Sequence, residues 1–269
     1  MIALIRYFVR RLRVIFLVLA AGLFAFHFVM PFVFRSVRAQ AGQTPTFFAR
    51  FIPKGIQEFL GVDRLPLATA DGFVSVIYQH PFVLIALLAF PIVACSTLLT
   101  GELERGWASL VLSRPVRRWV VVATVTICTL VGEALLVAAM LLGTHWGFAQ
   151  AGVAGPAIHS LLRLGAGVFG LGIAVTGLSL FFAAACEEVG EATGWPITLL
   201  LLMYVGNYLA QLWPVLRPYA KYSLFYHYQP VRAFTEGAFP TLSFEVFGAV
   251  AILGMLGALV VYVRRDFRL

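Results

Sequence analysis

Two carboxylates and an arginine stand close together between two long apolar runs: Glu102, Glu104 and Arg105. In a helix, Glu102 and Arg105 would be spaced for an i,i+3 ion pair, whereas Leu103 and Trp107 would lie on a separate apolar face. Such an amphipathic helix would lie at a membrane interface, with its charged side toward the aqueous phase. Carboxylates on an ordered face indicate contact with another protein. The simpler alternative is a basic loop that only orients the neighbouring spans.

A second group of carboxylates follows a later apolar run. Glu187, Glu188 and Glu191 lie in the segment 186–196, which has no basic residue. A loop with acidic but no basic residues is unusual on the cytoplasmic side of a membrane, where loops are usually rich in lysine and arginine. The segment is therefore a candidate for a second protein-docking loop, and a solvated loop without a partner is the alternative of equal weight.

Three polar side chains fall inside apolar runs: His27, Glu133 and Asn207. An ionised carboxylate at the centre of a bilayer costs about 2.5–3.5 kcal/mol on insertion scales, so we expect Glu133 to face a bundle interior or a wet cavity. There it would line a polar path or a dimer interface, or it would be protonated and bonded to a neighbouring helix. For His27 and Asn207 we expect hydrogen bonds between helices.

Signatures of metal binding and of catalysis are missing from the sequence. The histidines show neither HExxH nor another ligand spacing, and the odd number of cysteines lies in or at the end of apolar runs. We therefore predict no metal site and no catalytic residue. The sequence also has no GxxxxGK[ST] phosphate loop, so an ATP-driven step would need a partner.

One glycine pattern imitates a nucleotide-binding motif. Gly165, Gly167 and Gly170 spell GxGxxG, but that motif needs a preceding strand within a βαβ unit, and none is predicted here. Small residues instead recur every four positions at Ala166, Gly170 and Ala174. This spacing predicts close packing of the helix against another helix.

The composition places these residues in a membrane. Hydrophobic residues make up 61% of the 269-residue chain and charged residues only 12%, against about 25% in soluble domains. Water cannot accommodate so much apolar surface, so the surrounding solvent must be the lipid bilayer. The net charge of +8 lies largely in arginine clusters beside apolar runs, which is typical of membrane anchoring and argues against a nucleic-acid partner.

Helices of about 20 apolar residues cross the hydrocarbon core of a bilayer. The sequence predicts an all-α integral membrane protein with a single domain over residues 1–269. This domain begins with an interfacial helix over residues 1–13. Its six predicted spans are 14–34, 81–100, 120–143, 161–185, 197–213 and 244–263.

An even number of spans places both termini on the same side of the membrane. Arginines crowd into the short segments 1–13, 101–119 and 264–268, which the positive-inside rule assigns to the cytoplasm. The long loops 35–80 and 214–243 then lie outside. Within the first, residues 46–60 are predicted to form an amphipathic helix on the membrane surface. The second is expected to cap the bundle or to enter it as a re-entrant hairpin.

The segment that contains the first carboxylates also resembles a known family. Glu102-x-Glu104-x-Gly106, followed by Leu110-Val-Leu-Ser-Arg-Pro-Val-Arg-Arg118, looks like the E-x-E-x-G and LLS-x-P-x-x-R segment of ABC-2 type transporter permeases. Further matches are Phe59-Leu-Gly61 in the first long loop and the terminal Arg264-Arg-Asp-Phe267. The resemblance covers the whole chain in architecture, and its specific part is this segment.

The resemblance implies the membrane-spanning subunit of an ATP-driven exporter in the bacterial inner membrane. In that family the segment is the coupling helix, which seats in a groove of a separately encoded ATPase and transmits its closure to the spans. The implied partners are two ATPase copies, which bind ATP and Mg²⁺, and a second permease in a homodimer or heterodimer. This chain itself would bind no cofactor. The implied ATPase contacts are Glu102, Glu104, Arg105, Gly106, Arg114 and Arg118.

As a permease, the chain would have two further candidate sites. The acidic residues Glu187, Glu188 and Glu191 would form the second docking loop, and Glu133 and Asn207 would lie along the translocation path.

Two other classes of function are compatible with the composition. An intramembrane protease of the CAAX type carries paired glutamates beside a span, as at Glu187 and Glu188. Such proteases also need an arginine where Ala192 stands and histidines in later spans, whereas the only later histidine here is His227, in a loop. A structural or regulatory membrane subunit would have the same composition as a permease.

Overall fold

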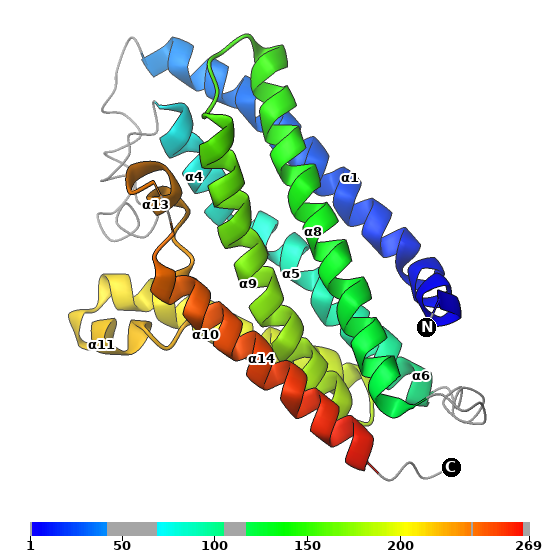
Figure 1. Cartoon of the computed structure of the whole chain (residues 1–269). Helices are drawn as coiled ribbons and strands as arrows, with labels where there is room; N and C mark the ends of the chain where they lie inside the picture. Colours follow the sequence, from blue (N-terminus) through cyan, green and yellow to red (C-terminus); the bar gives the residue numbers. More distant parts are fainter. Residues whose placement is uncertain (1, 42–68, 105–116, 238, 266–269) are drawn as a thin grey trace.

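The computed structural model describes residues 2–41, 69–104, 117–237 and 239–265, and every regular element within them is a helix (Figure 1). Among these residues, six helices are long and apolar enough to cross a membrane. The chain is therefore an all-α, multi-pass membrane protein. The spanning helices are α1 (Ile2–Ala41), α5 (Pro81–Cys95) with its continuation to Glu104, α8 (Arg118–Ala151), α9 (Ile158–Ala185), α10 (Val189–Leu212) and α14 (Thr241–Arg264).

The spanning helices run beyond the ends of the predicted spans. α8 continues as far as Ala151, and the left-handed φ of +67° at Gly152 ends it. α10 begins at Val189 and holds Pro196 inside it, so the predicted loop 186–196 shortens to 186–188. Proline is tolerated inside membrane helices, which is why it is a poor boundary marker here. The basic N-terminal segment is helical and continues without a break into the first span as part of α1.

The second span changes its hydrogen-bonding pattern along its length. Pro81 stands in the first turn of α5, where its missing N–H costs nothing, and His80 caps that end. α5 then widens into the π-helical turn η1 (Ser96–Thr100) and continues as α6 (Gly101–Glu104). π-Helical turns inside helices are rare and are frequently found at functional sites.

Both ends of the chain lie at one end of the bundle, here called the terminal face (Figure 1). α1 begins at this face and α14 ends there, and α6 lies there too. The opposite end, the distal face, carries α4 (Ala70–Gln79) and α13 (Pro230–Thr235), which pack against each other. The chain between α10 and α13 forms η2 (Pro214–Leu216), α11 (Arg217–Ala220) and α12 (Leu224–His227). The predicted helix over 46–60 lies outside the described residues.

α5 and α9 form the centre of the bundle. In the most apolar stretch of each, 67% of the residues are buried, against 50% in α8, 22% in α10 and in α14, and 17% in α1. α5, α8 and α9 also pack against one another. Exposed leucine, isoleucine and valine side chains cover the outer helices, which suits contact with lipid.

α9 and α14 cross with their backbones in contact. A Cβ atom on Gly254 would lie 2.3 Å from the carbonyl oxygen of Gly177, so only glycine fits at this crossing. The small residues predicted to pack are only partly involved, because Gly170 and Ala174 are buried but Ala166 is exposed. A four-residue repeat drifts by about 40° around a helix at each step, which turns Ala166 away from the contact.

The crossing predicts a position-specific loss of stability. Gly254→Val should destabilise the protein by about 1–3 kcal/mol, because the added atoms meet the backbone of α9. Gly248→Val in the same helix should be neutral by comparison, since nothing lies within 4 Å of a Cβ at that position. Thermal unfolding of each purified variant in detergent measures its loss of stability. Equal Tm values for the two variants would contradict the close backbone contact between α9 and α14 at Gly254.

Candidate functional site

Both carboxylates of α6 are bound by other helices. The Tyr7 hydroxyl in α1 donates to Glu102, with distances of 3.1 Å to Oε1 and 3.0 Å to Oε2, and Glu102 is only 9% exposed. Glu104 is exposed, and its Oε2 accepts from the backbone N–H of Val189 at 3.3 Å. That N–H belongs to the first turn of α10, where donors lack helical partners and negative charge is favoured. α6 is therefore joined to both α1 and α10.

The start of α8 is joined to the end of α14. Nη1 of Arg118 donates to the carbonyl oxygen of Val263 at 3.1 Å and to that of Arg265 at 2.6 Å. The last carbonyls of a helix have no helical donors, and a positive charge near them is favourable. Arg118 thus acts as a C-cap supplied by another span.

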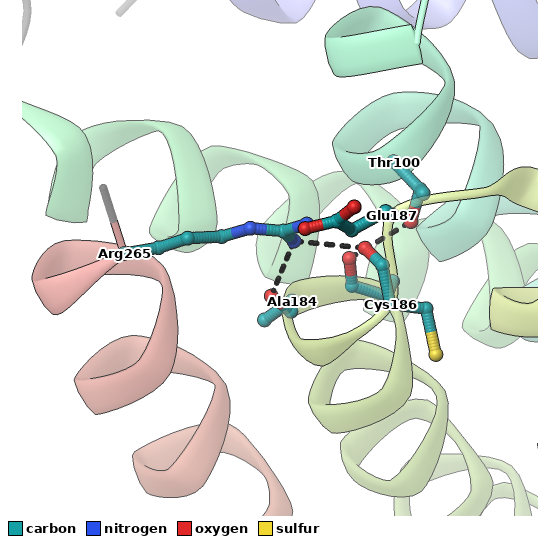
Figure 2. Close-up of polar contacts among 6 residues, drawn as sticks. Thr100, Ala184, Cys186, Glu187 and Arg265 are labelled. Atoms are coloured by element: carbon teal, nitrogen blue, oxygen red, sulfur yellow. Dashed lines mark hydrogen bonds and ion pairs between the residues drawn. The ribbon is translucent and has the colours of Figure 1, made fainter. Parts of the chain in front are cut away.

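The end of α14 is joined in turn to the end of α9, as Figure 2 shows. Nη1 of Arg265 donates to the carbonyl oxygens of Ala184 at 3.0 Å and of Cys186 at 2.8 Å. Nη2 of Arg265 also lies 3.6 Å from Oε1 of Glu187. The Glu187 side chain is 88% exposed, so this ion pair adds little stability by itself.

The π-helical turn supplies the remaining donor at the end of α9. The Thr100 hydroxyl donates to the carbonyl oxygen of Ala183 at 2.8 Å, and the bond is fully buried (Figure 2). Two of the carbonyls that the end of α9 leaves open, those of Ala183 and Ala184, are therefore satisfied by two different spans. An unsatisfied carbonyl at such a buried position would cost about 1–3 kcal/mol.

These contacts form one connected system at the terminal face. Glu104 stands directly before the segment 105–117 and Arg118 directly after it, so both ends of the segment enter the same system. Through it the segment is connected to α1, α9, α10 and α14. We call this system the terminal linkage, defined by the side chains of Tyr7, Thr100, Glu102, Glu104, Arg118 and Arg265.

The predicted ATPase-contact residues divide into two groups. Glu102 and Arg118 make the contacts within the chain described above, and Glu104 does so while remaining exposed. The other predicted residues lie outside the described residues; they are Arg105, Gly106 and Arg114.

The predicted second docking loop lies beside the terminal linkage. Glu187 and Glu188 are exposed in the short connection between α9 and α10, and Glu191 is exposed in the first turn of α10. Burial and the nearby Glu191 carboxylate raise the pKa of the Cys186 thiol, which Arg265 lowers in part. This thiol therefore stays protonated at neutral pH. The three exposed carboxylates give this part of the face a negative charge.

Glu133 and Asn207 are not hydrogen-bonded to each other in this structure. Glu133 is fully buried in α8 against Gly172 of α9, and neither of its carboxylate oxygens has a hydrogen-bond partner among the described residues. Oδ1 of Asn207, in α10, is also buried without a described partner. The two side chains predicted for one path are therefore not joined by a hydrogen bond through these oxygens.

His27 does not form the hydrogen bond between helices that its position predicts. Its Nδ1 lies 2.8 Å from the carbonyl oxygen of Leu23 in the same helix, and its Nε2 has no partner among the described residues. Its ring instead lies against Tyr78, with centroids 4.6 Å apart. Tyr78 hydrogen-bonds to Thr144 at 2.9 Å and accepts from Tyr228 through its carbonyl at 2.9 Å, which ties α4 to α8 and to the chain before α13.

Several members of the terminal linkage have no distinctive signal in the sequence. Tyr7 and Thr100 become functional candidates only through partners far away in the chain. Arg265 is a topology marker by sequence, and nothing there separates it from Arg264, which is exposed. The available hint is general: charged side chains just beyond span ends lie close to open helix carbonyls.

Comparisons of the chain with protein-family models, with curated proteins and with solved structures give no match.

The capping role of Arg265 can be tested against its neighbour. Arg265→Met keeps much of the apolar stem but removes the donors to α9, and should lower the free energy of unfolding by about 1–3 kcal/mol. Arg264→Met removes an exposed charge and should leave the Tm close to that of the wild type. Thermal unfolding in detergent gives both values. A matched loss in the two variants would assign the effect to net charge, not to the cap.

Proposed function

We propose that this chain is the membrane-spanning permease subunit of an ATP-driven ABC-2 type exporter in the bacterial inner membrane. Two permeases would form the translocation path, and each would couple to a separate ATPase subunit through the segment 101–119. The observation that carries the proposal is the terminal linkage, because it fastens both ends of this segment to other spans. The family resemblance of the same segment supports it independently.

The terminal linkage would convert movement of the segment into movement of the spans. Glu104 holds the start of α10, and Arg118 holds the end of α14. Arg265 passes the connection on to α9, at the centre of the bundle. A partner that shifts the segment would therefore act on three further spans at once. A loop that only anchors its neighbours needs no such connections.

The charges of the terminal face would suit a docked protein. The exposed carboxylates of Glu104, Glu187, Glu188 and Glu191 lie at this face, beside arginine-rich segments. Mixed charges at the rim of an interface set orientation and specificity more than affinity. In the proposal this face is cytoplasmic, and ATP and Mg²⁺ bind to the partner because the sequence has no phosphate loop.

The burial of Glu133 bears on where the path would run. The side chain lies inside one copy of the chain, among α5, α8 and α9. A path formed between two copies would reach it only if these helices separated. No comparable observation favours the protease alternative, since Glu187 and Glu188 point into solvent and Glu187 pairs with Arg265.

The proposal predicts that docking and coupling can be separated by mutation. Co-expression with ATPases encoded next to this chain, followed by affinity purification, should recover a complex. The double variant Arg105→Ala, Arg114→Ala should reduce recovery of the ATPase. Arg118→Met should leave recovery unchanged but lower the ATP hydrolysis of the reconstituted complex several-fold, because the segment is released from α14.

Arg117→Met is the matched control, since Arg117 is exposed and directly precedes Arg118. It should behave like the wild type in both assays. If no ATPase co-purifies with the intact chain, the permease proposal is rejected. If Arg118→Met abolishes co-purification, Arg118 belongs to the docking surface and the coupling role of the terminal linkage is wrong.

A further inference from the structure

Glu133 occupies an unusual position for a carboxylate. It is fully buried, about halfway along α8, and neither oxygen has a hydrogen-bond partner among the described residues. Gly172 of α9 leaves room for it, because a Cβ atom there would lie 3.1 Å from both Cδ and Oε2 of Glu133. A glutamate that served only to link helices would be hydrogen-bonded to one of them. This one is enclosed but not bound.

The groups that face Glu133 do not compensate a negative charge. From α5 the titratable neighbour is the Cys95 thiol, which is itself buried, and α9 presents a glycine. α9 and α14 carry their charged or titratable residues only near their ends, and His27 of α1 lies further toward the distal face, beside Gly143. An isolated buried carboxylate costs several kcal/mol more when ionised than when it carries a proton. The site therefore favours the protonated acid.

Buried hydroxyl groups line the bundle between Glu133 and the terminal face. Thr129 precedes Glu133 by one turn of α8, and its Oγ1 lies 4.0 Å from Sγ of Cys95. Thr176 and Ser179 follow Gly172 on the same face of α9, and the Ser179 hydroxyl has no partner among the described residues. The π-helical turn adds two more hydroxyls. We call these side chains the hydroxyl row: Ser96, Thr100, Thr129, Thr176 and Ser179, all of them buried.

The opposite direction is closed by apolar side chains. The buried side chains of α8 beyond Glu133 are Leu136, Val137 and Met140, and the next polar one is Thr144. At 1.5 Å per residue, Thr144 lies about 16 Å further along the helix. In α9 the buried residues on this side are likewise apolar, up to Leu161. Polar access to Glu133 is therefore one-sided.

We propose that Glu133 is a proton-binding site that exchanges its proton with the aqueous phase at the terminal face through the hydroxyl row. A proton adds to a carboxylate oxygen to give the neutral acid and leaves again as the carboxylate forms. The row ends at Thr100, whose hydroxyl belongs to the terminal linkage. The inference concerns this chain alone and does not depend on an ATPase partner.

Infrared spectroscopy tests the proton directly. The full chain is reconstituted in bilayers of ether-linked lipids, which lack the ester carbonyls that absorb near a carboxylic acid. A carboxylic C=O band should be present at neutral pH, where exposed carboxyl groups are ionised, and lost at alkaline pH, and Glu133→Gln should abolish it. Glu133→Asp should retain a shifted band, which secures the assignment if the glutamine variant misfolds. Glu245→Gln, at an exposed carboxyl, should leave the band unchanged.

The route is tested by the rate at which this band shifts after transfer into D₂O. Thr176→Val removes a hydroxyl of the row and should slow the shift several-fold. Thr144→Val removes a buried hydroxyl on the closed side and should not. Each threonine also donates to the carbonyl four residues before it, and Thr144→Val removes in addition the bond to Tyr78, so it is the more disruptive of the two changes. A Glu133 band that persists at every pH, or no such band at all, overturns the proton site. Equal slowing in the two variants overturns the one-sided route.

Discussion

The ends of helices set the strongest constraint on this bundle. Each helix leaves backbone groups without partners at its termini, and at the terminal face side chains of other spans bind several of these groups. The carbonyls at the end of α9 receive donors from Thr100 and Arg265, and those at the end of α14 receive Arg118. The first N–H of α10 is bound by Glu104. Capping is usually local in sequence, whereas here each cap comes from a different span. The same hydrogen bonds therefore both satisfy the open backbone groups and connect the spans to one another.

Arginine suits this arrangement because its planar guanidinium presents several donors in a fixed fork and cannot lose its charge. Arg265 serves two carbonyls and a carboxylate, and Arg118 serves two carbonyls. A lysine also has three donors, but they sit on one rotating ammonium group at the end of a flexible stem and would not hold two helices in a defined geometry. The linkage is also directional, since Arg118 begins α8 and binds the end of α14, while Arg265 follows α14 and binds the end of α9. A shift of Arg118 reaches α9 through α14, whereas Thr100 binds α9 directly from the other end of the segment.

Composition and the length of the apolar runs were enough to predict the helical membrane fold and its six spans. A run of about 20 apolar residues is long enough to cross the bilayer, and a helix satisfies all its backbone hydrogen bonds within the run. The ends of spans were harder, since Pro196 does not break α10 and nothing stops α8 before Gly152. The burial of Glu133 follows from the cost of exposing it to lipid. The residues that pack against Glu133 cannot be predicted from the sequence, because a helix that is apolar on every side has no periodic pattern to reveal its rotation about its axis. The same limit hides Arg265, whose partners are known only once α9 and α14 are placed together.

The π-helical turn η1 connects the two polar systems of the bundle. One added residue in a turn rotates everything beyond it by about 100° relative to a regular α-helix. With the turn present, α5 directs Cys95 toward Thr129 while Thr100 reaches Ala183 and Glu102 reaches Tyr7. If η1 relaxed to α-helical bonding, Cys95 could keep its place, but Thr100 and Glu102 would turn away from their partners. The carbonyl of Ala183 would then lose its donor, and α6 would lose its contact with α1. The buried bond from Thr100 to Ala183 therefore stabilises the π-helical turn. Any movement that breaks this bond also destabilises the turn.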